Sequence, residues 1–258
     1  INPESLEDYE PMFKKVAGVT HECWDLLSFD EAEDDLLLFS ANLGIWQIDH
    51  NHVKSFVAKY DTWKLFRSIS DSSRVSVGTS DGLACIYREN GQWIDQGFVD
   101  GIEGDIKYIF EDSMENIWLS TGIVLHKMNI LSYRGNKIDE INLTTFDSIS
   151  GLPEGHITIQ PYGNKLLFGT GSGLFTFNPA TLRFQSTDLL GEKFFSKTIG
   201  IHRMSKDKTG KLWLVTHSFD GRISIGHVTP RIEEGQGEDP EWVNTPFMGL
   251  SHEIKHAV

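Results

Sequence analysis

Short apolar runs alternate with polar turns along the chain, and one arrangement of them recurs five times. In each copy an apolar run ends in Ser or Thr, and a Gly shortly afterwards opens a second apolar run. The runs and their glycines are Asp35–Ser40 with Gly44, Arg74–Thr79 with Gly82, Asn116–Thr121 with Gly122, Lys165–Thr170 with Gly173, and Lys211–Thr216 with Gly221. Successive glycines are 38, 40, 51 and 48 residues apart, so the pattern predicts a repeated structural unit of that length.

A further short strand precedes each copy and is joined to it by a polar turn. These strands are predicted at 22–30, 64–71, 105–112, 156–162 and 199–207. Gly, Asn, Asp and Ser fill the turns, because they supply the positive φ angles and local hydrogen bonds of tight hairpins. A fourth, outer strand follows less regularly, for example around 91–94 and 182–185.

Four short strands joined by hairpins form a small antiparallel sheet that exposes its edges and cannot bury both faces alone. Packing several such sheets radially around an axis solves both problems. The pattern therefore predicts an all-β protein, a β-propeller of about five complete four-stranded blades with partial blades at both ends. No helix is predicted.

A single propeller domain is expected over residues 1–258. The blade copies are placed at about 22–63, 64–104, 105–155, 156–198 and 199–248, with 249–258 as the start of a further blade. Residues 1–21 are interpreted as the outer part of a preceding blade. The chain begins with Ile1 and shows no signal peptide, so we expect a piece cut from a larger ring. An open ring exposes sheet edges and apolar blade faces, which predicts self-association.

Composition excludes several classes of protein. The net charge of −14 argues against the phosphate-neutralising surface of a nucleic-acid-binding protein, and against docking on anionic lipid. No apolar stretch approaches the ~18 residues that span a bilayer, so membrane attachment is expected only through the parent protein. With two cysteines, Cys23 and Cys85, a disulfide framework and a Cys-based zinc ribbon are excluded. Both cysteines fall in predicted strands and are interpreted as buried free thiols, although one bridge between them stays open.

Several segments resemble the two-component regulator propeller repeat. FEDSMENIWLST at 110–121 and SKDKTGKLWLVT at 205–216 match its succession of apolar strand, Asp, short turn, Trp and Thr. FGTGSGLFTFN at 168–178 matches the second half, and GLPEGHI at 151–157 matches the usual beginning of a blade. The resemblance covers about residues 22–258, although the first copy lacks the Trp and the fourth lacks the Asp.

In that family, such propellers form the extracytoplasmic sensing region of membrane-bound sensor kinases and hybrid two-component regulators. The resemblance therefore implies a non-catalytic ligand-binding sensor in the periplasmic or extracellular part of a bacterial membrane protein. It also implies a small-molecule or oligosaccharide ligand and a parent protein that works as a homodimer, with a histidine kinase domain elsewhere in that parent.

The sequence holds no catalytic signature. It lacks HExxH, GxSxG, P-loop and Rossmann motifs, so no catalytic residue, metal or cofactor is predicted. His50 and His52 lie two residues apart in a polar turn, where an exposed hairpin is favoured over a metal clip. The glycine-rich GTGSG at 169–173 runs into a strand rather than a helix, and is interpreted as a blade hairpin.

A ligand site is expected on one face of the ring. The loops that lead into the inner strands and the loops that join second and third strands share that face. The candidate residues from these two loop sets are His21, Asp105 and His156, and Ser80, Asp81, Ser172 and His217.

Two other functions stay open. The first is a secreted propeller lyase or hydrolase acting on a polysaccharide or lactone, because antibiotic-inactivating lyases carry similar repeats on this fold. The second is a protein-interaction scaffold of the WD40 kind, although its signatures are absent apart from a chance Trp24–Asp25 pair.

Overall fold

The computed structural model describes residues 22–31, 34–41, 43–49, 52–121, 124–195 and 197–244, and the statements below concern these residues. They contain nineteen strands in five antiparallel sheets, in each of which the strands lie in chain order. The predicted end pieces 1–21 and 249–258, together with His21, His50 and Gly122, lie outside the described residues.

The strands group by sheet as follows. The first sheet contains β1 (Cys23–Glu31), β2 (Asp34–Ala41), β3 (Gly44–Asp49) and β4 (His52–Ala58). The second contains β5 (Thr62–Arg67), β6 (Arg74–Thr79), β7 (Gly82–Glu89) and β8 (Gln92–Glu103). The third contains β9 (Tyr108–Glu111), β10 (Ile117–Ser120), β11 (Leu125–Arg134) and β12 (Lys137–Phe146). The fourth contains β13 (Ile157–Tyr162), β14 (Lys165–Thr170), β15 (Gly173–Asn178) and β16 (Arg183–Ser186). The fifth contains β17 (Ile199–Lys206), β18 (Leu212–Ser218) and β19 (Ile223–Val228).

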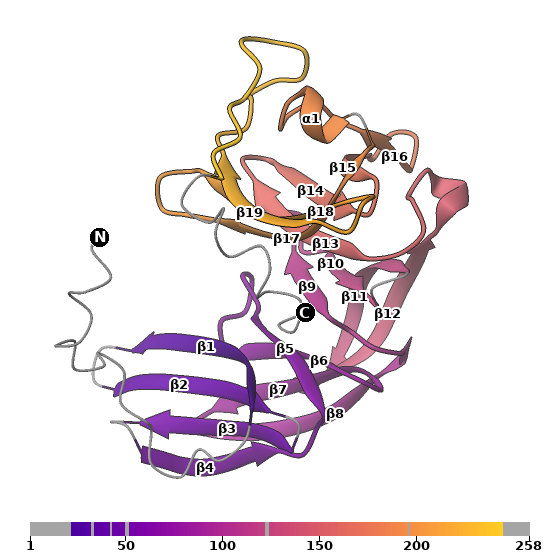
Figure 1. The fold of residues 1–258 in the computed structure, drawn as a ribbon. Coiled ribbons are helices and arrows are strands. Elements are labelled where there is room, and N and C mark those ends of the chain that lie inside the picture. The colour runs from indigo at the N-terminus through magenta and orange to yellow at the C-terminus, as the bar shows by residue number, and fades with distance from the viewer. Residues whose placement is uncertain are drawn as a thin grey trace, which may run out of the picture.

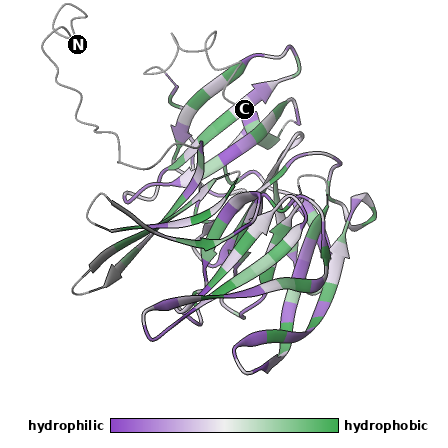
Figure 2. Cartoon of the chain, turned by 90° about the horizontal axis from the view of Figure 1, so that it is seen from below, coloured by the Kyte–Doolittle hydropathy of each residue, from purple (hydrophilic) through white to green (hydrophobic). Residues whose placement is uncertain are grey.

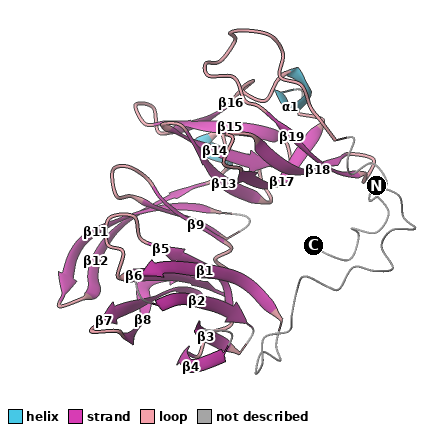
Figure 3. Cartoon of the chain, turned by 90° about the vertical axis from the view of Figure 1, so that its left-hand side faces the viewer, coloured by secondary structure: helices cyan, strands magenta, loops and turns pink. Residues whose placement is uncertain are grey.

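The sheets are the blades of a propeller, as the sequence predicted. Figure 1 shows them arranged around a common centre, with β1, β5, β9, β13 and β17 innermost and the first and fifth blades at the two ends of an arc; Figure 3 shows the same succession from the side. Each inner strand contacts the next one along the chain. The fifth blade has three strands in the described residues, and His227 pairs with Val243 beyond β19 through backbone N···O distances of 2.9 and 3.0 Å. The blade boundaries drawn from the sequence stay predictions.

The recurring Thr and Gly lock the turn between the second and third strands of a blade. In the β6–β7 turn, Oγ1 of Thr79 donates to the Gly82 carbonyl at 2.9 Å and accepts from the Gly82 N–H at 3.1 Å. Gly82 has φ +146°, and a Cβ there would lie 2.3 Å from the carbonyl oxygen of Ile102, so the turn requires glycine. Thr170 and Gly173 repeat the bond between β14 and β15, at 3.0 Å.

The recurring Asp and Trp lock the turn between the first and second strands. Asp112 accepts from the backbone N–H of Asn116 at 3.0 Å and from the Trp118 indole at 2.8 Å, and Asp207 accepts from the Trp213 indole at 3.0 Å. Burial acts to raise the pKa of Asp112, but the hydrogen bonds from Trp118 and Asn116 outweigh it and leave the pKa below its ordinary value. The motif that carries the family resemblance is therefore a structural one.

Apolar side chains fill the spaces between neighbouring blades, while polar residues gather at the turns (Figure 2). Trp118 is 2% exposed, and its ring lies 5.5 Å from that of Phe168 on the next blade. Leu38 is fully buried as well, so the interpretation of these positions as inter-blade core is confirmed. Trp213, at the matching position of the fifth blade, is only half-buried.

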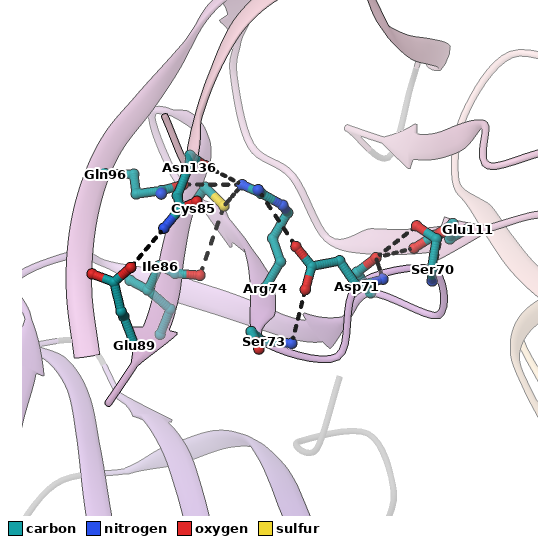
Figure 4. A network of polar contacts seen from close by, with 11 residues as sticks. Ser70, Asp71, Ser73, Arg74, Cys85, Ile86, Glu89, Gln96, Glu111 and Asn136 are labelled. Carbon is teal, nitrogen blue, oxygen red and sulfur yellow. Dashed lines mark hydrogen bonds and ion pairs between the residues drawn. The ribbon is translucent and has the colours of Figure 1, made fainter. Parts of the chain in front are cut away.

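A buried polar network joins the second and third blades (Figure 4). Arg74 of β6 points toward Cys85 and donates to the backbone carbonyl of Asn136, in the β11–β12 hairpin, at 2.8 Å. The carboxylate of Glu111, in β9, accepts from the Ser68 hydroxyl at 2.7 Å and from the Ile69 N–H at 2.8 Å. Since Glu111 is 2% exposed, the third blade is held to the turn after β5 by a desolvated, charge-assisted set of bonds.

Two sequence expectations are wrong in part. Cys85 is a buried free thiol as predicted, but Cys23 is free and exposed, because it is the first residue of β1 and lies beyond the covered part of the sheet. The structure also contains a one-turn helix, α1 (Glu192–Phe195), which buries Phe194 against the fifth blade, and a 3-10 turn at Ser148–Ser150. Elements this short carry no detectable helical period.

Candidate functional site

Each blade has an aromatic residue or a histidine in the first half of its inner strand or directly before that strand. Irregularities in strand pairing fall between Cys23 and Asp25, between Thr62 and Lys64, and between Ile201 and Arg203. The residues left unpaired are Trp24, Trp63 and His202. A bulge of this kind turns an extra side chain out of the regular alternation of a strand. Three of the five inner strands therefore turn a ring out of their regular alternation.

These rings and two others form a row that we call the axial ring row: Trp24, Trp63, Tyr108, His156 and His202, one from each blade. Ring centroids lie 5.1 Å apart between Trp24 and Trp63, 5.5 Å between Tyr108 and His156, and 5.1 Å between His156 and His202. Lys107 bridges the remaining gap, with Nζ 5.5 Å from the Trp63 ring centroid. Trp24 is 46% exposed and the other four rings are half-buried, so the row is open to solvent.

Hydrogen bonds tie three blades together within the row. The backbone carbonyl of His202 accepts from His156 Nε2 at 2.7 Å and from the Tyr108 hydroxyl at 3.3 Å. A carbonyl can only accept, so neutral His156 carries its hydrogen on Nε2 and leaves Nδ1 as an acceptor. The polar end of the row is thus fixed in orientation and keeps one unprotonated ring nitrogen.

His217 extends this end of the row, with its ring centroid 4.4 Å from that of His202. The ring fits because Gly200 carries no side chain: a Cβ there would lie 2.3 Å from His217 Cε1. His217 Nδ1 is buried and has no hydrogen-bond partner among the described residues. This atom is a polar group for which the described residues provide no partner.

Burial and neighbouring positive charges favour the neutral forms of His156 and His202. Burial lowers the pKa of His156, the bond to the His202 carbonyl acts to raise it, and the charges of Lys107 and Arg203 lower it further. Burial also lowers the pKa of His202, with the neighbouring His217, His156 and Arg203 acting in the same direction. At neutral pH the row offers imidazole rather than imidazolium.

Of the predicted site residues that the structure describes, only some belong to the row. His156 and His217 lie in and against it, and Asp105 borders it through an ion pair of 3.0 Å with Lys107. Ser80, Asp81 and Ser172 occupy the turns beside it, without a bond to the row in the described structure. One contact joins the two predicted loop sets. The N–H of Ile106, next to Asp105 at a strand entry, donates to the carbonyl of Thr79, next to Ser80 in the turn between the second and third strands, at 2.9 Å.

Sequence reasoning missed four members of the row: Trp24, Trp63, Tyr108 and His202. A usable signal was present, since an aromatic residue or histidine stands near the start of the inner strand in all five copies.

In the part of the chain that the structure describes, no group of three or more His, Cys, Asp or Glu side chains is placed to hold a metal ion. No helix in the same residues is long and apolar enough to cross a membrane.

Comparison with known proteins identifies structural relatives. No family model and no curated protein sequence matches the chain. The extracellular domain of BT4673 from B. thetaiotaomicron, assigned to the one-component systems, is 17% identical with a TM-score of 0.58, over 82% of this chain and 31% of that domain. The extracellular domain of BT3049 from the same organism, assigned to the hybrid two-component systems, is 16% identical with a TM-score of 0.53. The match covers 76% of this chain and 26% of that domain.

A catalytically inactive variant of virginiamycin B lyase from Staphylococcus aureus, solved with quinupristin, is 12% identical with a TM-score of 0.55, over 87% of this chain and 73% of the lyase. The chain thus spans less than a third of these two extracellular domains and most of the lyase. At these identities the likeness shows the fold. It confirms the resemblance drawn from the repeat: the chain has the propeller fold of extracellular domains from one-component and hybrid two-component systems.

Proposed function

We propose that this chain is a non-catalytic sensor propeller, part of the extracytoplasmic region of a bacterial two-component signalling protein, and that it binds its ligand on the axial ring row. One observation carries the proposal: every blade contributes an exposed or half-buried ring, and these rings contact one another in two groups, Trp24 with Trp63 and Tyr108 with His156 and His202. Large rings in propeller blades otherwise pack between blades, as Trp118 does. Rings that meet near the centre instead form an amphipathic surface suited to recognition.

The row suits a flat, polar molecule. The indoles of Trp24 and Trp63 offer a π surface, while Tyr108, His156 and His217 offer hydrogen-bonding atoms at the opposite end. An oligosaccharide has this combination, with C–H faces that stack on rings and hydroxyls around the rim. The likeness to extracellular domains of one-component and hybrid two-component systems supports the sensor assignment. The parent is proposed to act as a homodimer.

Thermal unfolding of the 258-residue chain with a panel of oligosaccharides tests the proposal. A ligand at 100 times its dissociation constant stabilises the folded state by about 2.7 kcal/mol, a readily measured shift. Trp63→Ala should abolish the shift. Phe195→Ala should leave it intact, because Phe195 is 43% exposed on α1 and is not a member of the row. Equal loss in both variants would contradict binding at the row.

A second candidate is a propeller lyase, favoured by the hydrogen-bonded group of Tyr108 and His156 and by the likeness to virginiamycin B lyase. The unprotonated Nδ1 of His156 is able to accept a proton from a substrate. Mass spectrometry of quinupristin after incubation with the chain separates the two candidates. Turnover that His156→Ala abolishes would establish the lyase and overturn the sensor proposal.

A further inference from the structure

A small hollow lies at the end of the second blade that is opposite the axial ring row. Its volume is about 210 Å³, and we call it the arginine hollow; it is lined by Arg67, Ser72, Ser73, Arg88 and Gly91. Arg67 is the last residue of β5, and Trp63 of the row is the second residue of the same strand. A strand rises about 3.3 Å per residue, so about 13 Å of β5 separates these two residues. The hollow is therefore a separate place from the row.

Aromatic contacts set the position of both guanidinium groups in the hollow. Arg67 Cζ lies 4.3 Å from the centroid of the Phe29 ring, and Arg88 Cζ lies 5.8 Å from the centroid of the Trp93 ring. Phe29 and Trp93 themselves meet edge to face, with centroids 5.4 Å apart. A guanidinium stacked on a ring uses its flat face, so the N–H groups at its edge stay available for hydrogen bonds. The aromatic pair thus supports two positive groups at the wall of one hollow.

Backbone contacts bring the serines to the same place. Arg67 Nε donates to the carbonyl of Ser72 at 2.8 Å, and the backbone N–H of Arg88 donates to the carbonyl of Ser73 at 2.8 Å. These two bonds join the turn between β5 and β6 to the end of β7. Nη1 and Nη2 of Arg67 make no hydrogen bond to the described residues, so two of its nitrogens keep their donors for a ligand.

The carboxylates of the neighbouring turns are engaged elsewhere. None of the lining residues of the hollow is acidic. Asp71, in the turn between β5 and β6, pairs with Arg74 at 3.6 Å, and Glu89 accepts from Asn136 Nδ2 at 3.3 Å. Figure 4 shows both carboxylates turned toward these partners. Two arginines without an acidic lining residue are a local exception in a protein with a net charge of −14.

We propose that the arginine hollow binds a tetrahedral oxyanion, phosphate or sulfate, either as the free ion or as the ester group of a larger molecule. The edge of a guanidinium matches the spacing of oxyanion oxygens, and such charge-assisted bonds are stronger than neutral ones. Two guanidinium groups and two serine hydroxyls offer donors to more oxygens than the two of a carboxylate. The hollow is smaller than the about 300–1,000 Å³ of pockets that enclose drug-sized ligands, which suits recognition of a small anionic group.

Isothermal titration of the 258-residue chain at pH 7.5 compares phosphate, sulfate, acetate and glycerol 1-phosphate. The ionic strength is held constant, because salt screens exposed charges. We expect phosphate and sulfate to occupy one site and to bind at least tenfold more tightly than acetate. Tighter binding of glycerol 1-phosphate than of phosphate would identify an ester as the ligand, and the reverse order would identify the free ion.

Variants locate the anion in the hollow. Arg67→Gln should weaken phosphate binding at least tenfold. Arg67→Lys keeps the charge beside Phe29 but loses the fork of donors, so it should also weaken binding, and it serves as the second variant if Arg67→Gln fails to fold. Arg134→Gln is the matched control, because it removes an equal charge from an exposed position in the third blade and should bind phosphate as the wild type does.

Three results would overturn the proposal. The first is the absence of saturable binding by phosphate and sulfate up to about 10 mM. The second is an equal loss of affinity in Arg67→Gln and Arg134→Gln, which would indicate attraction by overall charge. The third is wild-type affinity in Arg67→Lys, which would exclude recognition by the fork. None of these results decides whether the axial ring row binds a ligand, because no member of the row lines the hollow.

Discussion

Gly200 links the fold to the candidate site, and its replacement by alanine gives a sharp test of the described geometry. A Cβ at this position of β17 would lie 2.3 Å from His217 Cε1, 2.7 Å from His217 Nε2 and 2.9 Å from the Gly171 carbonyl oxygen. These distances are far below van der Waals contact, so the His217 ring must leave its place against His202. Inserting a methyl group into a filled site typically costs about 1–3 kcal/mol, which is the expected loss of unfolding free energy.

Urea unfolding and histidine titration by NMR measure the two consequences. Because His217 helps to hold the pKa of His202 low, moving its ring away should raise the pKa of His202 toward its ordinary value. Gly171→Ala is the matched control, since nothing lies within 4 Å of a Cβ there and its backbone is not left-handed. If Gly200→Ala proved as stable as Gly171→Ala and left the titration of His202 unchanged, the described packing of His217 would be wrong.

Three further changes test the fold. Glu111→Gln should lower the unfolding free energy, measured in urea, by about 2–3 kcal/mol, because hydrogen bonds to a buried carboxylate are worth about 1.5–3 kcal/mol each. A loss below about 0.5 kcal/mol would count against the described bonds from Ser68 and Ile69 to Glu111. The pKa of Asp112 is depressed by its bonds to Trp118, so its carboxylate stabilises the fold above about pH 4, and that contribution disappears as the pH falls through the lower folded-state value. Asp112→Asn should therefore unfold at lower temperature than the wild type at pH 7, and the two melting temperatures should converge toward pH 2; parallel curves would contradict the assignment. In the folded chain one thiol, Cys23, should react with a disulfide reagent, and Cys85 should react only in urea; two rapid equivalents would contradict the burial of Cys85.

The repeat was readable from the sequence because each of its signals is local. Thr79 and Gly82 are three residues apart and bond directly to each other, so the requirement for both is written into one turn. Asp112 and Trp118 are likewise joined within one hairpin. Because these turns recur at similar spacing along the chain, they predict the strand order within each blade without reference to any distant residue.

The axial ring row could not be derived in the same way, because its members belong to different blades. Trp24 and Trp63 touch across 39 positions of sequence, and His156 and His202 across 46. The bulges at Trp24 and His202 shift the alternation of apolar and polar residues by one position, and in strands of eight or nine residues the pattern on either side of the shift is too short to locate it. His156 is predicted because it stands at a strand entry on one face of the ring, whereas Trp24 is noticed only as part of a chance Trp-Asp pair and Trp63 is not singled out by any motif.

A site built from every blade also has a mechanical consequence. The row is held by contacts between blades, such as the His156 bond to the His202 carbonyl, rather than by contacts within one sheet. A ligand that spans several rings therefore adds new links between blades, and it stabilises the arrangement of the blades in which the rings are correctly spaced. The same arrangement of blades determines the outer surfaces of the arc. Under the proposed function, a ligand at the centre would therefore alter how this propeller meets a neighbouring domain or a second copy, which is the property that a sensor requires.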